Sequence, residues 1–163
     1  MKDMPDLLEG LKRSASILSA FIQTIPADAL HRRRDAACWT PAEHASHLAQ
    51  VQPMLLERLQ RFRDEEHPVF VPYIPGEGDE EPDTPEVMSI DAALEQFSRY
   101  RTKQTELLAS ASATTWEKTG SHPEFALYSC YILARHILMH DHWHMYRMEE
   151  LWLTRDDYLT QLT

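Results

Sequence analysis

The chain has 163 residues, of which 43% are hydrophobic and 26% are charged, and its formal net charge is -10. This length is typical of one domain that buries a hydrophobic core, and so negative a chain is poorly suited to bind nucleic acid or an anionic membrane surface. The only basic cluster, residues 32–34, is too short to change that, and we expect it to form a solvated turn.

The two cysteines, Cys38 and Cys130, are far apart in the sequence and fit no metal-binding or redox spacing. We therefore expect both to be small buried residues. No stretch approaches 18 consecutive apolar residues, and the N-terminus lacks the apolar core of a signal peptide. These observations favour a cytoplasmic protein without a membrane partner.

The first predicted helix runs from about Pro5 to Thr24, with apolar residues three and four positions apart. A polar connection with at most one short turn follows. The second helix has a clear start, because Thr40 is a good N-cap, Pro41 suits the first helical position and Glu43 completes a capping box.

The second predicted helix extends to about Arg63, but Pro53 interrupts its apolar row. Proline has no backbone N–H to donate and its ring clashes with the carbonyl four residues earlier, here that of Ala49. We expect a kink at this point.

Residues 67–88 contain five prolines, two glycines and an acidic run, so they cannot form a helix. Fully extended, this segment can reach roughly 70 Å, whereas a helix of about 24 residues spans roughly 36 Å. The segment is therefore long enough to return along the molecule as a crossover, which would place the third helix parallel to the second.

The third predicted helix begins near Ser89 or Asp91 and ends near Ser110, and the fourth runs from about Phe125 to Leu153. No repeat and no β-type alternation of useful length appears. The sequence thus predicts an all-α chain, residues 1–163 forming a single domain. Its architecture is a four-helix bundle with one long crossover between helices 2 and 3, in up-down-down-up order.

Two histidines of the fourth helix, His140 and His144, fall inside its apolar stripe. Residues four apart on a helix are stacked neighbours, and burying an imidazole without a partner costs free energy. A metal ion would satisfy both side chains. Of the nearby histidines, His142 points away from the stripe and is expected to be exposed, while His136 lies at its edge as a structural or pocket residue.

Periodicity does not decide the third ligand. His44 lies nearer the centre of the apolar stripe of the second helix than His47, which lies on its flank, so the helical wheel mildly favours His44. Three imidazoles without a fourth protein ligand would leave an open position, as in catalytic metal sites.

The segments Trp39-Thr-Pro-Ala-Glu-His-Ala-Ser-His47-Leu48 and His140-Asp-His-Trp-His144 resemble the DinB superfamily of metal-binding four-helix bundles, as does His122-Pro-Glu-Phe125. The resemblance covers nearly the whole chain. In that family a histidine before a leucine on the second helix joins a His-x-x-x-His pair on the fourth. The resemblance therefore implies the metal ligands His47, His140 and His144, with His44 as a structural or supporting residue.

Nitrogen ligands suit divalent zinc, nickel, copper or iron, and of these we expect zinc or nickel. The resemblance further implies a metal-dependent transferase or hydrolase that acts with a low-molecular-weight thiol or a small electrophile. The alternative is a non-catalytic metal-binding stress-response module, and in either case we expect a homodimer. No residue is placed well enough to be named as a general base. Asp141 is a candidate to orient a ligand histidine, Arg147 is a candidate to hold a substrate carboxylate, and Trp39 is expected to be a packing anchor.

Overall fold

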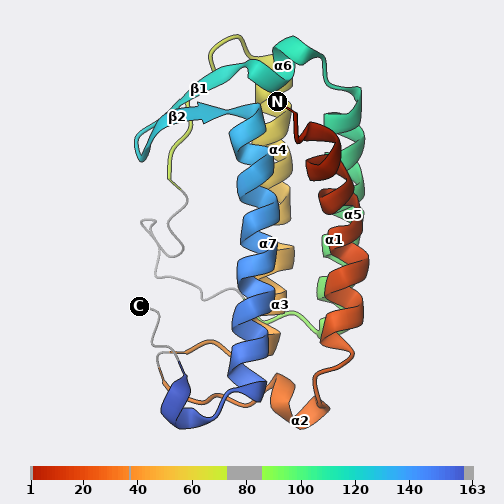
Figure 1. Cartoon of the computed structure of the whole chain (residues 1–163), viewed down its shortest axis with the longest axis vertical. Coiled ribbons are helices and arrows are strands. Elements are labelled where there is room, and N and C mark those ends of the chain that lie inside the picture. The colour runs from red at the N-terminus through yellow and green to blue at the C-terminus, as the bar shows by residue number, and fades with distance from the viewer. Residues whose placement is uncertain (1, 37, 73–85, 160–163) are drawn as a thin grey trace.

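The computed structural model describes residues 2–36, 38–72 and 86–159 and shows a four-helix bundle (Figure 1). Its long elements are α1 (Met4–Ile22), the consecutive helices α3 (Pro41–Gln50) and α4 (Gln52–Asp64), α5 (Ile90–Ser110) and α7 (Cys130–Leu153). Shorter elements are α2 (Ala27–Leu30), α6 (Ala113–Glu117), the strands β1 (Thr119–His122) and β2 (Phe125–Ser129), and the 3-10 helix η1 (Asp156–Tyr158). The predicted fold class is confirmed.

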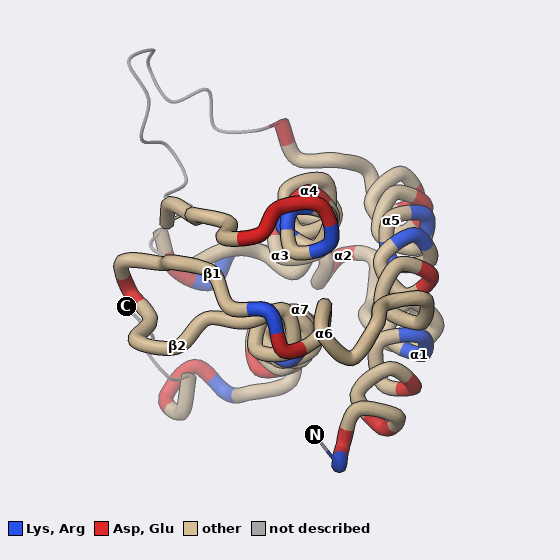
Figure 2. Tube along the Cα trace, turned by 90° about the horizontal axis from the view of Figure 1, so that it is seen from above, with Lys and Arg blue, Asp and Glu red and all other residues tan. Residues whose placement is uncertain are grey.

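The bundle has the predicted crossover topology. Seen end-on, α1 lies beside α5 and α7, and the α3–α4 pair lies beside the same two helices (Figure 2). In Figure 1 α1 and α7 run downwards, whereas α3, α4 and α5 run upwards. The second and third long helical segments are therefore parallel, as the length of the crossover predicts, although residues 73–85 of that crossover lie outside the described part of the chain.

Side-chain caps set the helix starts. Thr40 and Glu43 form the predicted capping box, with the Glu43 N–H donating to Thr40 Oγ1 at 3.2 Å and the Thr40 N–H donating to a Glu43 carboxylate oxygen at 2.6 Å. Ser89 accepts from the Ala92 N–H at 3.3 Å. The predicted starts of these two helices are confirmed.

The predicted kink is a break in the helix at Val51, between α3 and α4. Pro53 leaves the Ala49 carbonyl without its usual helical donor, and the side-chain amide of Gln96 on α5 donates to that oxygen at 3.0 Å. The Gln52 side chain donates to the Leu48 carbonyl at 2.8 Å. Two amide side chains thus satisfy the carbonyls at the break.

The prediction that the last helix begins at Phe125 is wrong. Residues 125–129 form β2, which pairs antiparallel with β1, and α7 begins at Cys130 after the cap of Ser129. The hairpin packs on the first residues of the crossover segment, since the Ser121 N–H donates to the Pro68 carbonyl at 2.9 Å. A Cβ atom on Gly120 would lie 2.7 Å from that same oxygen, so this close approach requires glycine.

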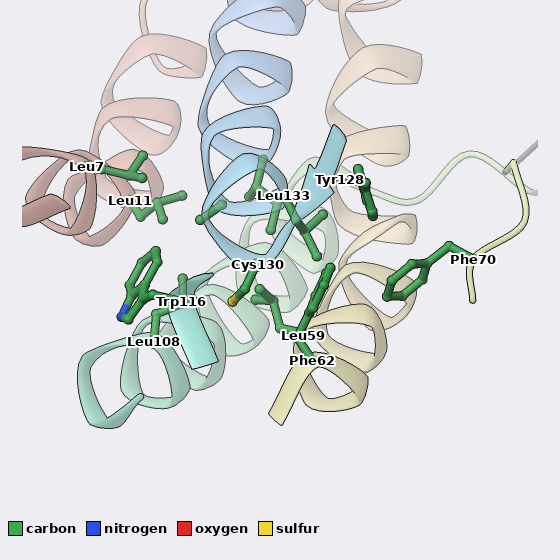
Figure 3. Close-up of a cluster of buried hydrophobic side chains, with 12 residues drawn as sticks. Leu7, Leu11, Leu59, Phe62, Phe70, Leu108, Trp116, Tyr128, Cys130 and Leu133 are labelled. Atoms are coloured by element: carbon green, nitrogen blue, oxygen red, sulfur yellow. The ribbon is translucent and has the colours of Figure 1, made fainter. Parts of the chain in front are cut away.

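The apolar core has two parts. One lies at the end of the bundle that carries the hairpin and includes Leu59, Phe62, Trp116 and Leu133 (Figure 3). The other lies at the opposite end, around α2 and the start of α3. A polar layer separates them, with buried Ser14, Gln52, Arg101, Gln104 and Asp141 at intermediate positions along their helices.

Two expectations about single residues need correction. Arg34 does not lie in a solvated turn: its side chain is only 4% exposed, its guanidinium donates to the Leu151 carbonyl at 2.9 Å, and it pairs with Asp156 beyond the end of α7. Cys130 is buried as predicted, and burial raises its pKa to about 12, but Cys38 is half-buried. Among the described helices none is long and apolar enough to cross a membrane.

Candidate metal centre

The structure brings His47, His140 and His144 together between α3 and α7. The Nε2 atom of His140 lies 3.3 Å from Nε2 of His47 and 3.1 Å from Nε2 of His144. One nitrogen from each of the three residues lies within 4.8 Å of the other two. This convergence arises because α3 packs against α7, where His140 and His144 are stacked one turn apart.

Hydrogen bonding among the three rings does not explain this arrangement. Nε2 of His140 carries at most one proton or one lone pair, so it can form a hydrogen bond to only one of its two close neighbours. The other contact places two nitrogens together without a hydrogen bond, which is unfavourable in a buried site.

A metal ion fits the same geometry. In a tetrahedral zinc site with Zn–N bonds of about 2.0–2.1 Å, the ligand nitrogens are about 3.3 Å apart. The measured separations of 3.1 and 3.3 Å are close to this value. The residues present are therefore suited to hold a divalent ion.

The protonation states of the three residues also suit ligation. Burial lowers the pKa of His140 to about 4, and it lowers the pKa values of His47 and His144 as well, with the neighbouring histidines adding to the shift of His144. Imidazoles with lowered pKa values are neutral at pH 7, and a neutral imidazole has the free lone pair that a metal requires.

His44, which the helical wheel favoured, lies behind the three-histidine cluster. Its Nδ1 atom is 2.8 Å from Nδ1 of His144, on the side of that ring opposite the cluster. His44 is 4% exposed, and burial lowers its pKa to about 4. The structure thus places His44 as a partner of His144, while His47 joins the pair from α7.

Asp141 does not orient a histidine. Its carboxylate accepts two hydrogen bonds from the Arg101 guanidinium, at 2.6 and 3.1 Å. Within the described residues, Nδ1 of His140 is buried and has no hydrogen-bond partner. His142 is exposed, as predicted, and His136 is half-buried.

A cavity of about 330 Å³ opens beside the cluster and is lined by all three histidines. Trp39 forms part of its wall, with its ring stacked on His144 at a centroid distance of 6.1 Å and an interplanar angle of 17°. Trp39 is 40% exposed, so it is a wall of the cavity and not only the packing anchor expected from the sequence. Arg147 also lines this cavity, and its guanidinium is paired with Glu150.

A second cavity of about 270 Å³ meets the cluster from the side of the hairpin. His47 and His140 line both cavities, so these two side chains form part of the wall of each. The second cavity also carries Arg58, His122 and His136. Sequence reasoning missed Arg58, because a single arginine on a helix gives no functional signal, and it assigned no role to His122.

Comparisons with known proteins agree with the fold. The model of the DinB superfamily matches residues 11–148. Among solved structures, the chain is similar to YfiT from Bacillus subtilis, described as a probable metal-dependent hydrolase with an unusual four-helix bundle topology. The two chains are 18% identical with a TM-score of 0.77, over 93% of this chain and 86% of YfiT. No curated protein is significantly similar in sequence.

Proposed function

This chain belongs to the DinB superfamily, and we propose that it is a metal-dependent enzyme in which His47, His140 and His144 hold a divalent transition metal, zinc or nickel. The observation that carries the proposal is the convergence of three imidazole nitrogens beside a cavity, with two of the three side chains also lining a second cavity. Three neutral ligands leave the full charge of the ion in place and leave a coordination position for a reactant. The description of YfiT as a probable metal-dependent hydrolase supports the same class of chemistry.

The proposed reaction is attack by water or a low-molecular-weight thiol on a small electrophile. A divalent ion bound here would supply Lewis-acid chemistry, lowering the pKa of a bound water or thiol. In a thiol transfer the new S–C bond forms as the bond from carbon to the leaving group breaks, and the leaving group takes that electron pair. The thiol proton passes to solvent or to the leaving group.

The chain's own residues would bind and orient the reactants. Trp39 presents an aromatic face beside His144, and Trp143 meets the same ring at a centroid distance of 4.7 Å, so two exposed indoles flank the first cavity. The apolar wall of the second cavity would exclude water from the opposite side. Two cavities that share His47 and His140 suit a reaction with two substrates.

Metal content tests the first half of the proposal. We expect the purified protein to hold one divalent ion per chain by elemental analysis, and His140→Ala or His144→Ala to lose it while remaining helical. His47→Ala should behave in the same way. The matched control is His142→Ala, which removes an exposed histidine of the same helix. Stoichiometric metal in purified His140→Ala or His144→Ala protein would contradict the assignment.

Turnover tests the second half. The zinc- or nickel-loaded protein would be assayed with bacillithiol, mycothiol or glutathione and a panel of small electrophiles, and with the electrophiles in water alone. We expect turnover that disappears with a chelator and returns with the metal. A protein that retains its metal but turns over no member of the panel would favour the alternative, a non-catalytic metal-binding module.

A further inference from the structure

The second cavity is lined by an arginine, Arg58, for which the described part of the chain supplies no ionic partner. Arg58 is half-buried on α4, and its Nη2 atom donates to the Val71 carbonyl at 2.7 Å. Its guanidinium carbon lies 5.8 Å from the centre of the Phe70 ring. Arg58 also interacts with the hydroxyl of Tyr128, through a side-chain hydrogen bond and its charge. Within the described residues Arg58 forms no ion pair, so its charge and its remaining N–H donors are available to a ligand in the cavity.

His122 supplies a second donor to the same cavity. The backbone N–H of Glu124 donates to Nδ1 of His122 at 3.2 Å, so the proton of the neutral ring must be on Nε2. Burial, followed by the nearby Arg58 charge, lowers the pKa of His122 and favours this neutral form. His122 lines the cavity, and its ring makes no other hydrogen bond with a described residue.

The remaining wall is mainly apolar, with Val51, Met54, Leu55, Leu133 and Ile137 contributing aliphatic side chains. A volume of about 270 Å³ is below the range of about 300–1,000 Å³ typical of sites for drug-sized ligands. The cavity therefore fits a small molecule. Glu124 also lines the cavity; its side chain is 60% exposed, and one carboxylate oxygen lies 4.0 Å from Nδ1 of His122. This negative charge disfavours ligands that carry more than one negative charge.

The charged end of the cavity is separated from the histidine cluster. Arg58 follows His47 by three helical turns, about 16 Å along the helix axis, although an arginine side chain on a helix leans back towards the N-terminus. His47 and His140 line the same cavity. A ligand held by Arg58 would thus extend along the aliphatic wall towards the cluster.

We propose that this second cavity binds a small monocarboxylic acid, with its carboxylate on Arg58 and His122 and its apolar body directed towards His47 and His140. A carboxylate matches the planar guanidinium fork of arginine. As a statement about the substrate class of the metal centre, this inference rests on the proposed function. Binding of the acid itself uses residues that are present without the metal.

Hexanoate and its neutral isostere hexanamide are suitable probes, with affinity measured by calorimetry or ligand-observed NMR on the full chain. We expect hexanoate to bind at least about tenfold more tightly than hexanamide. Arg58→Gln should reduce hexanoate affinity to the level of the amide, and Arg58→Lys should give an intermediate value. Arg63→Gln is the control, because Arg63 is exposed on the same helix and paired with Asp64; circular dichroism verifies that each variant is folded.

The His144→Ala variant separates this inference from the proposed metal centre. His144 lines the first cavity and not the second, so a metal-free His144→Ala protein should still bind hexanoate in an Arg58-dependent manner. Loss of hexanoate binding in that variant would show that the acid binds the metal instead and would overturn the inference. Equal hexanoate affinity in wild type and Arg58→Gln would overturn it as well. A purified wild-type protein without metal would contradict the proposed function. The comparison of hexanoate affinity between wild type and Arg58→Gln would still decide whether the second cavity binds the acid.

Discussion

At the scale of single residues, His44 determines which nitrogen of His144 faces the cluster. If Nε2 of His144 is to offer a lone pair, its proton must be on Nδ1, and the only described acceptor there is Nδ1 of His44 at 2.8 Å. His44 must then carry its own proton on Nε2. A metal-ligating histidine usually donates its second N–H in this way, which fixes the ring and raises its basicity. We therefore infer that His44 is a positioning residue and not a fourth ligand.

The first prediction concerns this contact. His44→Ala should weaken metal binding about 10- to 100-fold, because the second N–H of His144 loses its acceptor, but one ion per chain should still bind when the metal is in excess. His44→Asn, whose side-chain oxygen can accept the same N–H, should recover part of the affinity. Competition with a chromophoric chelator measures both values. A His44→Ala protein that binds no metal at any concentration would make His44 a ligand instead.

The second prediction concerns pH. The ordinary histidine pKa of 6.5 falls to about 4 for His44 and for His140 on folding. Between these values the unfolded chain binds more protons than the folded one, so stability rises with pH and is lost as pH falls below 6.5. For His44 alone the loss between pH 7.5 and pH 5 is about 2 kcal/mol.

Urea denaturation of the chelator-treated protein at pH 7.5 and pH 5 measures this loss. We expect a clearly lower midpoint at pH 5, a smaller pH effect in His44→Phe, and an unchanged effect in the control His142→Ala, whose residue is exposed. Equal midpoints at the two pH values would show that the buried histidines do not titrate as described.

His44 and His47 show which metal ligands could be predicted from the sequence and which could not. Helical periodicity identified the pair on α7, because both residues lie on one helix and their relative direction is fixed by 100° per residue. It could not choose between His44 and His47, since that choice depends on how α3 is rotated against α7 above the break at Val51. The resemblance to a family supplied what periodicity could not, and the structure places His47 beside His140.

At the scale of elements, the break between α3 and α4 directs His47 towards α7. α7 packs more extensively on α3, the part before the break, than on α4, whereas both parts pack closely on α5. Pro53 allowed the kink to be predicted, because its effect is local. The side chain that satisfies the freed carbonyl could not be predicted, since Gln96 lies on another helix, 47 residues away from Ala49 in the chain.

The third prediction tests this contact. Gln96→Ala should destabilise the protein by about 1–3 kcal/mol, because the Ala49 carbonyl loses its side-chain donor and Ala49 is fully buried. The matched control is Gln50→Ala, which removes an exposed bond to the Glu86 carbonyl and should cost less than about 0.5 kcal/mol. Thermal denaturation of both variants gives the comparison. A loss for Gln96→Ala no larger than that of the control would indicate that the break does not need this donor.

The hairpin was missed for a related reason. Strands of four and five residues are too short to show alternation, and only Ser129 separates the apolar residues 125–128 from the apolar pattern of α7. What makes them a strand is the pairing with β1 and the contact of β1 with residues 68–70. These are long-range contacts that a single sequence does not reveal, and the second cavity, which the hairpin helps to form, was missed with them.

At the scale of the whole molecule, the polar layer joins all four helical segments of the bundle. Arg101 of α5 donates to Ser14 of α1, to Gln52 of α4 and to Asp141 of α7, and also to Gln104 of its own helix. These contacts occupy all five N–H donors of the guanidinium. Since Asp141 lies between His140 and His144 in the sequence, we infer that the layer also fixes the rotation of α7 that directs both histidines towards α3.

The last prediction concerns this layer. Arg101 and Asp141 are each 1% exposed, so Asp141→Ala leaves a buried guanidinium without its counter-charge and should cost about 3–5 kcal/mol. The double variant Arg101→Met with Asp141→Leu removes both charges and should recover most of that stability. Asp64→Ala, which breaks the exposed pair with Arg63, should cost less than about 1 kcal/mol. Urea denaturation of the metal-free proteins measures all three.

The metal affinity of the double variant tests whether the polar layer orients α7 or whether helix packing alone does so. If the layer fixes the rotation of α7, the double variant should regain stability but bind metal more weakly than wild type, because apolar side chains of similar volume do not impose one register as a fully satisfied hydrogen-bond network does. A double variant that is as stable as wild type and binds metal equally well would show that helix packing alone positions His140 and His144. A double variant as unstable as Asp141→Ala would show instead that the loss of the five-donor network destabilises the bundle. The unpaired charge of Arg101 would then not be the main cause of the instability of Asp141→Ala.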